Sequence, residues 1–131
     1  MALTLDLLFL WRGNGQNMDV KIAVASSNGE TVNEHFGRAR LFRIYRLRDT
    51  GYELLELRET PPKCTGQQHS DDALEQAAQL ISDCRGVVAA QIGPGAIDAL
   101  LGHRIMAFTL PGSIDEAFAA LVRAKRFNYL Q

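Results

Sequence analysis

The stretch "VKIAVA", residues 20–25, decides the expected fold of this chain. A short, nearly continuous run of apolar and β-branched residues is typical of a central strand that is covered on both faces. Residues 86–91, "GVVAAQ", and residues 104–110, "RIMAFTL", predict two more strands. Because helix-like segments alternate with them, the expected fold class is α/β, a mixed sheet with helices packed against it.

Two further segments predict a β-hairpin. Residues 41–47, "LFRIYRL", and residues 52–59, "YELLELRE", flank residues 48–51, a connection of hairpin length with a turn-forming glycine. If strand 20–25 runs parallel to the two later strands, strand 41–47 runs antiparallel and strand 52–59 is parallel again. The sequence therefore predicts a mixed five-stranded sheet with one antiparallel strand.

The segment 70–84 has the periodicity of an amphipathic helix. Ser70 and Asp72 are alternative N-caps, and Gly86 follows its end. The residues expected on its apolar face are Ala73, Ala77, Leu80, Ile81 and Cys84. Because Cys84 lies on this face, we interpret it as a core residue.

Two more helices complete the prediction of about three. Residues 93–102 predict a short helix that begins at Pro94 and ends at Gly102. Ser113 and Glu116 have the spacing of a capping box and open a last helix. Its expected core face carries Ile114, Phe118, Leu121 and Val122.

The predicted strand directions bring several loops to one rim of the sheet. Loops 26–40, 60–70, 91–95 and 110–113 fall at the carboxyl ends of the parallel strands, where open α/β sheets bind ligands. The amino ends of the three helices gather there as well, and their unpaired N–H groups favour negative charge. We therefore expect an anionic ligand at this rim.

The side chains in these loops suit an anion that contains metal. They are His35, Arg38, Arg40, Lys63, Cys64, Gln67, Gln68 and His69, beside the exposed backbone of Gly93 and Gly95. Soft metals take sulfur and imidazole, whereas arginine and backbone N–H groups bind anionic atoms. Each has a structural alternative, since a loop histidine often only completes a turn, and Cys64 with His69 lacks the paired spacing of a zinc site. We interpret His103, between a helix and a strand, as structural.

Composition narrows the classes of partner. A length of 131 residues is about one domain, and a net charge of −1 gives no broad attraction to nucleic acid or to a membrane surface. Two cysteines are too few for a disulfide scaffold and predict a reduced, cytoplasmic setting.

The first residues, "MALTLDLLFLW", form the most apolar run of the chain. The run is too short to span a bilayer and lacks the basic start and cleavage site of a signal peptide. Either Met18 is an alternative start and residues 1–17 are a loose extension, or the run is an added edge strand or a dimer-forming arm. The expected oligomeric state is a monomer or a weak homodimer.

Three stretches carry a resemblance to a known family. They are "VKIAVASSNGETVNEHFGRARLFRIYRL", a later "KC", and "GVVAAQIGPGAIDALLGHRIMAFTLPGSIDEAFAALV". Together they resemble the nitrogenase iron–molybdenum cofactor biosynthesis family, which includes NifX-type and NafY-type carriers and the C-terminal domain of NifB. The most specific parts are the strand with "SSNG" and the "HFG" at 35–37. The family fold is similar to a ribonuclease H-like α/β domain, in agreement with the topology above.

The resemblance implies binding rather than catalysis. Members hold the iron–molybdenum cofactor or its iron–sulfur precursor, with no covalently bound cofactor, and exchange it with other nitrogenase cofactor-assembly proteins. It implies a cofactor-binding set of His35, Phe36, Gly37, Arg38, Gly93 and Gly95, with His35, Cys64 and His69 as metal ligands. The expected organisation is then an N-terminal extension at 1–18 and a single cofactor-binding domain at 19–131.

Other functions stay open beside this one. The chain has no C-x-x-x-C-x-x-C motif of radical-SAM enzymes, so it resembles a stand-alone NifX-type carrier. The alternative is a small metal-sulfide-cluster-binding or regulatory interaction protein of the same fold outside nitrogen fixation. A nuclease would need carboxylates on the central strands, and residues 20–25 contain none.

Overall fold

The computed structural model describes residues 18–60 and 70–124. Its elements are β1 (Asp19–Ala25), β2 (Thr31–Val32), the 3-10 turn η1 (Phe36–Arg38), β3 (Leu41–Arg48), β4 (Gly51–Glu59), α2 (Ser70–Leu80), β5 (Gly86–Ala89), α3 (Pro94–Gly102), β6 (Met106–Thr109), β7 (Gly112–Ser113) and α4 (Ile114–Arg123). No helix of the described residues is long and apolar enough to cross a membrane.

The main sheet has the order β4-β3-β1-β5-β6. β1, β5 and β6 run parallel, while β3 runs antiparallel to both β1 and β4. The predicted five-stranded mixed sheet with one antiparallel strand is therefore confirmed, as are the three helices. A two-stranded ribbon of β2 and β7, which the sequence did not predict, lies outside the main sheet.

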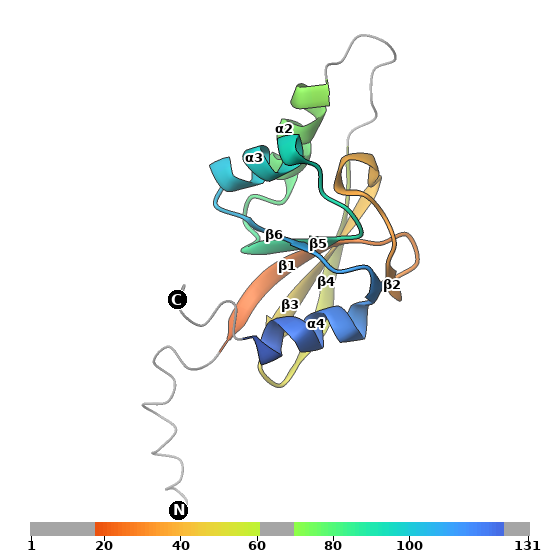
Figure 1. The fold of residues 1–131 in the computed structure, drawn as a ribbon. Coiled ribbons are helices and arrows are strands. Elements are labelled where there is room, and N and C mark those ends of the chain that lie inside the picture. Colours follow the sequence, from red (N-terminus) through yellow and green to blue (C-terminus); the bar gives the residue numbers. More distant parts are fainter. Residues whose placement is uncertain (1–17, 61–69, 125–131) are drawn as a thin grey trace, which may run out of the picture.

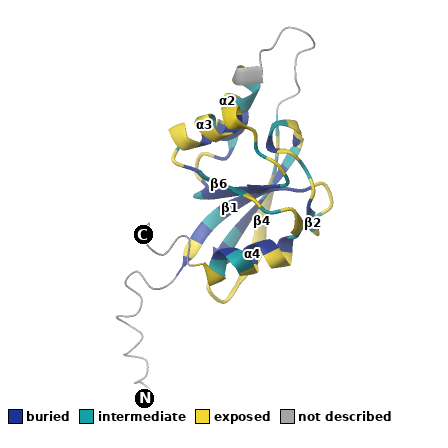
Figure 2. Cartoon of the chain, in the orientation of Figure 1, coloured by how far each residue is buried: buried dark blue, intermediate teal, exposed yellow. Residues whose placement is uncertain are grey.

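Helices cover both faces of the sheet, as Figure 1 shows: α2 and α3 lie on one face and α4 on the other. Alternate side chains of β1 pack on opposite faces of the sheet. Ala23 and Ala25 belong to the apolar cluster under α2 and α3, whereas Ile22 and Val24 belong to the cluster under α4. Because both sets are fully buried, β1 needs the continuous apolar run seen at 20–25 (Figure 2).

The boundaries of α2 and β6 differ from the prediction. The helix expected at 70–84 ends at Leu80, although Ile81 and Cys84 are still buried by the turn that follows. The strand expected at 104–110 begins only at Met106. Residues 103–105 instead close α3: the N–H groups of His103 and Ile105 donate to the Leu100 carbonyl, and Arg104 has a positive φ of 61°.

The predicted caps of α3 and α4 are confirmed, whereas Ser70 and Asp72, the expected alternative N-caps of the first helix, both lie within α2. α3 runs from Pro94 to Gly102, as expected. At the start of α4, the backbone N–H of Glu116 donates to Ser113 Oγ over 3.0 Å, which is the serine half of the capping box. Ile114, Phe118 and Leu121 of α4 are buried, as the periodicity indicated.

Arg58 of β4 ties the edge of the sheet to the end of α2. Its guanidinium donates to the Leu80 carbonyl at 3.0 Å and to both carboxylate oxygens of Asp83, at 2.6 and 2.9 Å. The hydrogen bond from Arg58 lowers the pKa of Asp83 well below its ordinary value, and Lys21 adds to the effect. This contact closes the carboxyl end of the helix, where a cation is favourable.

We expect Asp83→Asn to lower the free energy of unfolding at neutral pH by about 1 kcal/mol, a modest loss because the carboxylate side chain is 45% exposed and screened by solvent. A lowered folded-state pKa stabilises the fold fully above the unfolded value of about 3.9 and loses this effect as the pH falls through the folded value. The parent protein should therefore lose more stability on acidification than the variant.

Urea unfolding across the acid range measures this difference. Asp98→Asn is the control, because Asp98 is an exposed carboxylate of α3 for which the described residues show no ion pair. Parallel stability curves for the parent and the Asp83 variant would contradict the prediction.

Candidate functional site

The "SSNG" motif, residues 26–29, builds a polar turn after β1. The Oδ1 atom of Asn28 accepts the N–H groups of Glu30 and Thr31 at 2.8 and 2.9 Å, and the buried Ser26 hydroxyl accepts the N–H of Gly29 at 3.0 Å. Gly29 has a φ of 78°, which favours glycine. The motif thus has a structural role, since it reverses the chain so that β2 can pair with β7.

The backbone of His35 is fixed against the end of β5. The N–H of Phe36 donates to the Gln91 carbonyl at 2.9 Å, and the N–H of Ala90 donates to the Glu34 carbonyl at 2.9 Å. His35 and Gln91 form a parallel bridge, so the loop at 34–36 extends the sheet for one residue pair. The strand predicted to reach residue 91 leaves the main sheet after Ala89 because residues 90 and 91 pair here.

The side chains of His35 and Phe36 point in opposite senses. The imidazole is exposed, and no hydrogen bond to it is found within the described residues. The Phe36 ring is only 1% exposed and packs against Phe42, with ring centroids 5.4 Å apart. Phe36, which the sequence placed in the cofactor-binding set, therefore supports the site from the core, while the imidazole faces solvent above it.

Leu74 of α2 joins the two glycine-containing turns of the rim. A Cβ on Gly37 would lie 3.4 Å from Leu74 Cδ2, and a Cβ on Gly95 would lie 3.3 Å from Leu74 Cδ1. Glycine at these two positions lets η1 and the first turn of α3 approach the same leucine. The "HFG" and "GPG" motifs, which are far apart in the sequence, are thus held next to each other.

The first turn of α3 contributes backbone rather than side chains. Gly93 is the N-cap, makes no side-chain cap, and accepts the N–H of Ile97 at 3.0 Å. Gly93 and Gly95 are exposed, as is Arg38 at the end of η1. A helix N-terminus and a guanidinium on one rim give a local positive potential that suits an anion.

The structure adds Gln91 to the residues proposed from the sequence. Its side chain is exposed, and residues paired in a bridge project to the same side of a sheet, so its amide and the imidazole of His35 lie on the same side. The signal in the sequence was a polar residue at the carboxyl end of an otherwise apolar strand, "VVAAQ".

The other predicted ligands have different outcomes. Lys63, Cys64 and His69 lie outside the described residues, so their role stays a prediction.

Cys84 is confirmed as a core residue, and burial raises the pKa of its thiol to about 12, with the nearby Asp83 carboxylate adding to the effect. Within residues 18–60 and 70–124, no group of three or more His, Cys, Asp or Glu side chains could hold a metal ion. His103, interpreted as structural, contacts Glu75 through Nε2 at 2.7 Å.

The fold is an α/β domain whose rim, in the described part of the chain, carries one exposed histidine on a fixed backbone. A sequence profile of the family described as dinitrogenase iron-molybdenum cofactor matches residues 18–124, and the chain belongs to this family.

Several curated relatives are proteins named NifB or NifY. The chain is 39% identical to NifY of Klebsiella pneumoniae over 83 residues, which are 63% of this chain and 34% of NifY. It is 36% identical over 76 residues to NifB, a FeMo cofactor biosynthesis protein, of Herbaspirillum seropedicae, covering 58% of this chain and 14% of NifB. Over 105 residues it is 31% identical to NifB of Frankia alni, which covers 78% of this chain and 21% of that NifB. The chain thus spans at most about a third of the length of these relatives.

Solved structures share the fold. The protein PH0822 superposes with a TM-score of 0.61 at 22% identity, covering 79% of this chain and 91% of that one. A Thermotoga protein described as a NifB protein superposes with a TM-score of 0.51 at 20% identity, covering 81% of this chain and 90% of that one.

We expect Gly95→Ala to gain less stability than Gly102→Ala, although both lie in α3. Alanine in a helix ordinarily gains about 0.5–1 kcal/mol over glycine. A methyl group at Gly102 meets nothing within 4 Å, whereas at Gly95 it displaces Leu74.

A double-mutant cycle with Leu74→Ala, measured by urea unfolding, isolates this contact. We expect Gly95→Ala and Leu74→Ala to be coupled by about 0.5 kcal/mol or more, and Gly102→Ala to be additive with Leu74→Ala. Additivity for both glycines would show that Leu74 does not join the two turns.

Proposed function

We propose that this chain is a non-catalytic carrier that binds an iron–sulfur or iron–molybdenum cluster, the FeMo-cofactor or its precursor, during nitrogenase cofactor assembly. The observation that carries the proposal is His35: an exposed imidazole on a backbone held by two hydrogen bonds, in the "HFG" motif of a family named for this cofactor. The names of the NifB and NifY relatives support assembly proteins as donors and acceptors.

The geometry suits a cargo that is bound and later released. Imidazole is a good ligand for iron and donates one bond. Because no group of three ligands exists in the described part of the chain, the described side chains form no closed cage around a metal. In the proposal, His35 makes a labile metal bond, and Cys64 and His69 are further ligands to be tested.

The anionic atoms of the cluster need a separate partner. In the proposal, the Arg38 guanidinium and the backbone N–H groups at the start of α3 bind its charged surface. Gln91, which pairs with His35 through the backbone, gives a further hydrogen-bond donor in its exposed amide. Since these contacts are electrostatic and exposed, binding should weaken with added salt.

We expect His35→Ala to weaken binding of the isolated cluster by about tenfold or more, equivalent to about 1.4 kcal/mol, because one metal bond is lost. Anaerobic titration, followed by absorption spectra and by metal analysis after gel filtration, measures the affinity. His103→Ala is the matched control, since His103 contacts Glu75 and is not part of the rim. Equal affinities for the parent and the His35 variant would reject His35 as a ligand.

We expect cluster binding by the parent to decrease on acidification, because a protonated imidazole cannot coordinate metal. The same titration at a series of pH values measures this, with circular dichroism as a check that the fold persists. The His35 variant should show a flatter pH profile, and identical profiles would assign the pH dependence to another group.

A further inference from the structure

The edge strand β4 exposes an unusual amount of apolar surface. β4 pairs with β3 alone among the described strands, so its outer backbone edge has no described neighbour. The exposed fractions of its large apolar side chains are 40% for Tyr52, 49% for Leu54, 40% for Leu55 and 51% for Leu57. Edge strands ordinarily avoid such a surface unless something covers it.

The register of the hairpin shows which face these residues share. Leu54 pairs with Tyr45 and Tyr52 with Leu47, and both partners belong to the apolar cluster under α4. Leu57, opposite Arg43, follows on the same face, while Leu55 falls at a bulge without a partner. The other face carries Glu56 and Arg58. One face of β4 is therefore apolar and the other charged.

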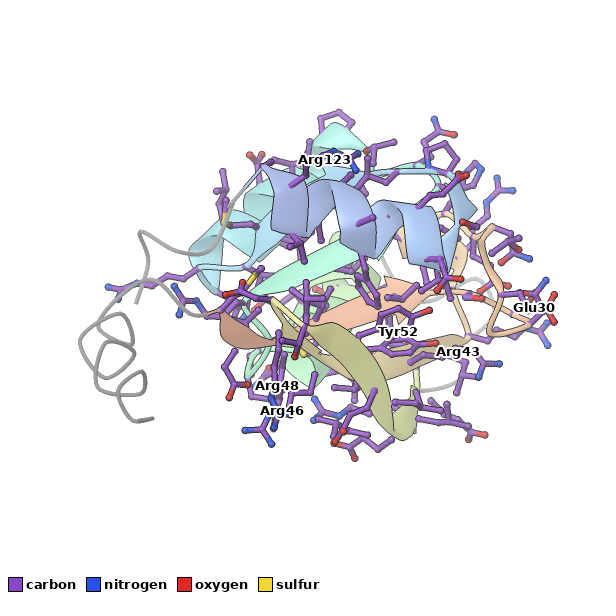
Figure 3. All side chains as sticks on the ribbon, turned by 90° about the horizontal axis from the view of Figure 1, so that it is seen from below. Glu30, Arg43, Arg46, Arg48, Tyr52 and Arg123 are labelled. Atoms are coloured by element: carbon purple, nitrogen blue, oxygen red, sulfur yellow. The ribbon has the colours of Figure 1, made fainter. Side chains whose placement is uncertain are left out.

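α4 covers only the near end of this apolar face. The ring of Tyr52 packs against Phe118 with centroids 4.6 Å apart, and Figure 3, seen from the α4 side, shows Tyr52 beside the helix. A cavity of about 380 Å³ lies between the β3–β4 turn and α4, and Tyr52, Phe118, Ala119 and Val122 line its apolar part. The apolar face of β4 thus leads into an open apolar cavity.

We propose that residues 2–11 pair with β4 as an antiparallel sixth strand and that Trp11 fills this cavity. The position at which the described chain begins favours this occupant. Met18 precedes β1, and its N–H donates to Asp49 Oδ2 in the β3–β4 turn at 3.3 Å, so the preceding residues enter beside the cavity. A chain arriving there from residue 11 runs antiparallel to β4.

The length of the segment fits this path. A strand beyond β4 lies three inter-strand spacings from β1, about 14 Å. The six residues 12–17, "RGNGQN", can span up to about 20 Å. The run 2–11 then lies along β4, which is nine residues long.

The sequence pattern of the segment fits the two faces. In a strand, Leu3, Leu5, Leu7, Phe9 and Trp11 share one face. We place this face on the side of Tyr52, Leu54 and Leu57. Thr4 and Asp6 then lie on the charged face of β4, together with Leu8 and Leu10.

Charge disfavours a second copy of the chain as the occupant. β4 carries Glu53, Glu56 and Glu59 with Arg58 as its single cation, and Arg58 already bonds Asp83. Antiparallel pairing of two β4 strands would bring these acids together, and like charges across a ladder are destabilising. Residues 2–11 contain one acid, Asp6. This proposal does not rest on the cluster-carrier function.

The fluorescence of Trp11, the one tryptophan of the chain, reads out the proposal in the full-length protein. We expect blue-shifted emission that is protected from acrylamide. Ala119→Glu places a charge in the cavity from an exposed helix position and should shift the emission to the red. Ala124→Glu is the matched control, since Ala124 is exposed and does not line the cavity. Solvent-exposed emission in the parent, or an equal shift in both variants, would overturn the proposal.

Hydrogen exchange distinguishes residues 2–11 from a second copy of the chain as the occupant of the β4 edge. Amides of β4 should be protected at every protein concentration, and Leu5→Asp with Leu7→Asp should reduce this protection about tenfold or more, whereas Thr4→Asp should not. Protection that appears only at high protein concentration would assign the edge to a second copy. Protection that survives the paired leucine substitutions, or its absence from the parent, would equally overturn the proposal.

Discussion

The burial of β1 on both faces is the constraint on which the rest of the structure depends. Ile22 and Val24 pack under α4, and Ala23 and Ala25 pack under α2 and α3. The loop that carries His35 follows from the carboxyl end of this strand. The Ala25 carbonyl accepts the N–H of Glu34, so the turn after β1 returns to the strand from which it came. A less completely buried β1 would leave the position of His35 undefined.

The rim combines a rigid backbone with open side chains. Phe36 anchors the turn in the core, Gln91 pairs with His35, and Leu74 packs against two glycines. None of these contacts holds the imidazole itself. Such an arrangement presents a ligand in a defined direction at low cost in conformational entropy, and it leaves room for a large cargo to approach. A carrier needs both properties, because the same bond must form readily and break again.

Helices cover the two faces of the sheet unequally. The two ends of β1 also lead to different kinds of surface. Two helices pack on the side of Ala23 (Figure 1), whereas α4 is the one described helix on the side of Val24, where its Phe118 contacts Tyr52. The polar rim of His35 lies at the carboxyl ends of β1 and β5, while the apolar cavity lies at the β3–β4 turn, at the opposite end of β1. The proposed cargo site and the apolar cavity are thus spatially separate.

The sequence by itself determined the sheet, its strand directions, the caps of α3 and α4 and the core position of Cys84, because these depend on local periodicity and on turn residues. It also singled out His35. Only the tertiary structure decided that Phe36 supports the site from below, that Asn28 is structural, and that Gln91 and Leu74 belong to the rim, because these roles arise from pairing between segments far apart in the chain. The early end of β5 has the same cause: residues 90 and 91 pair with the His35 loop, and no local pattern encodes that contact.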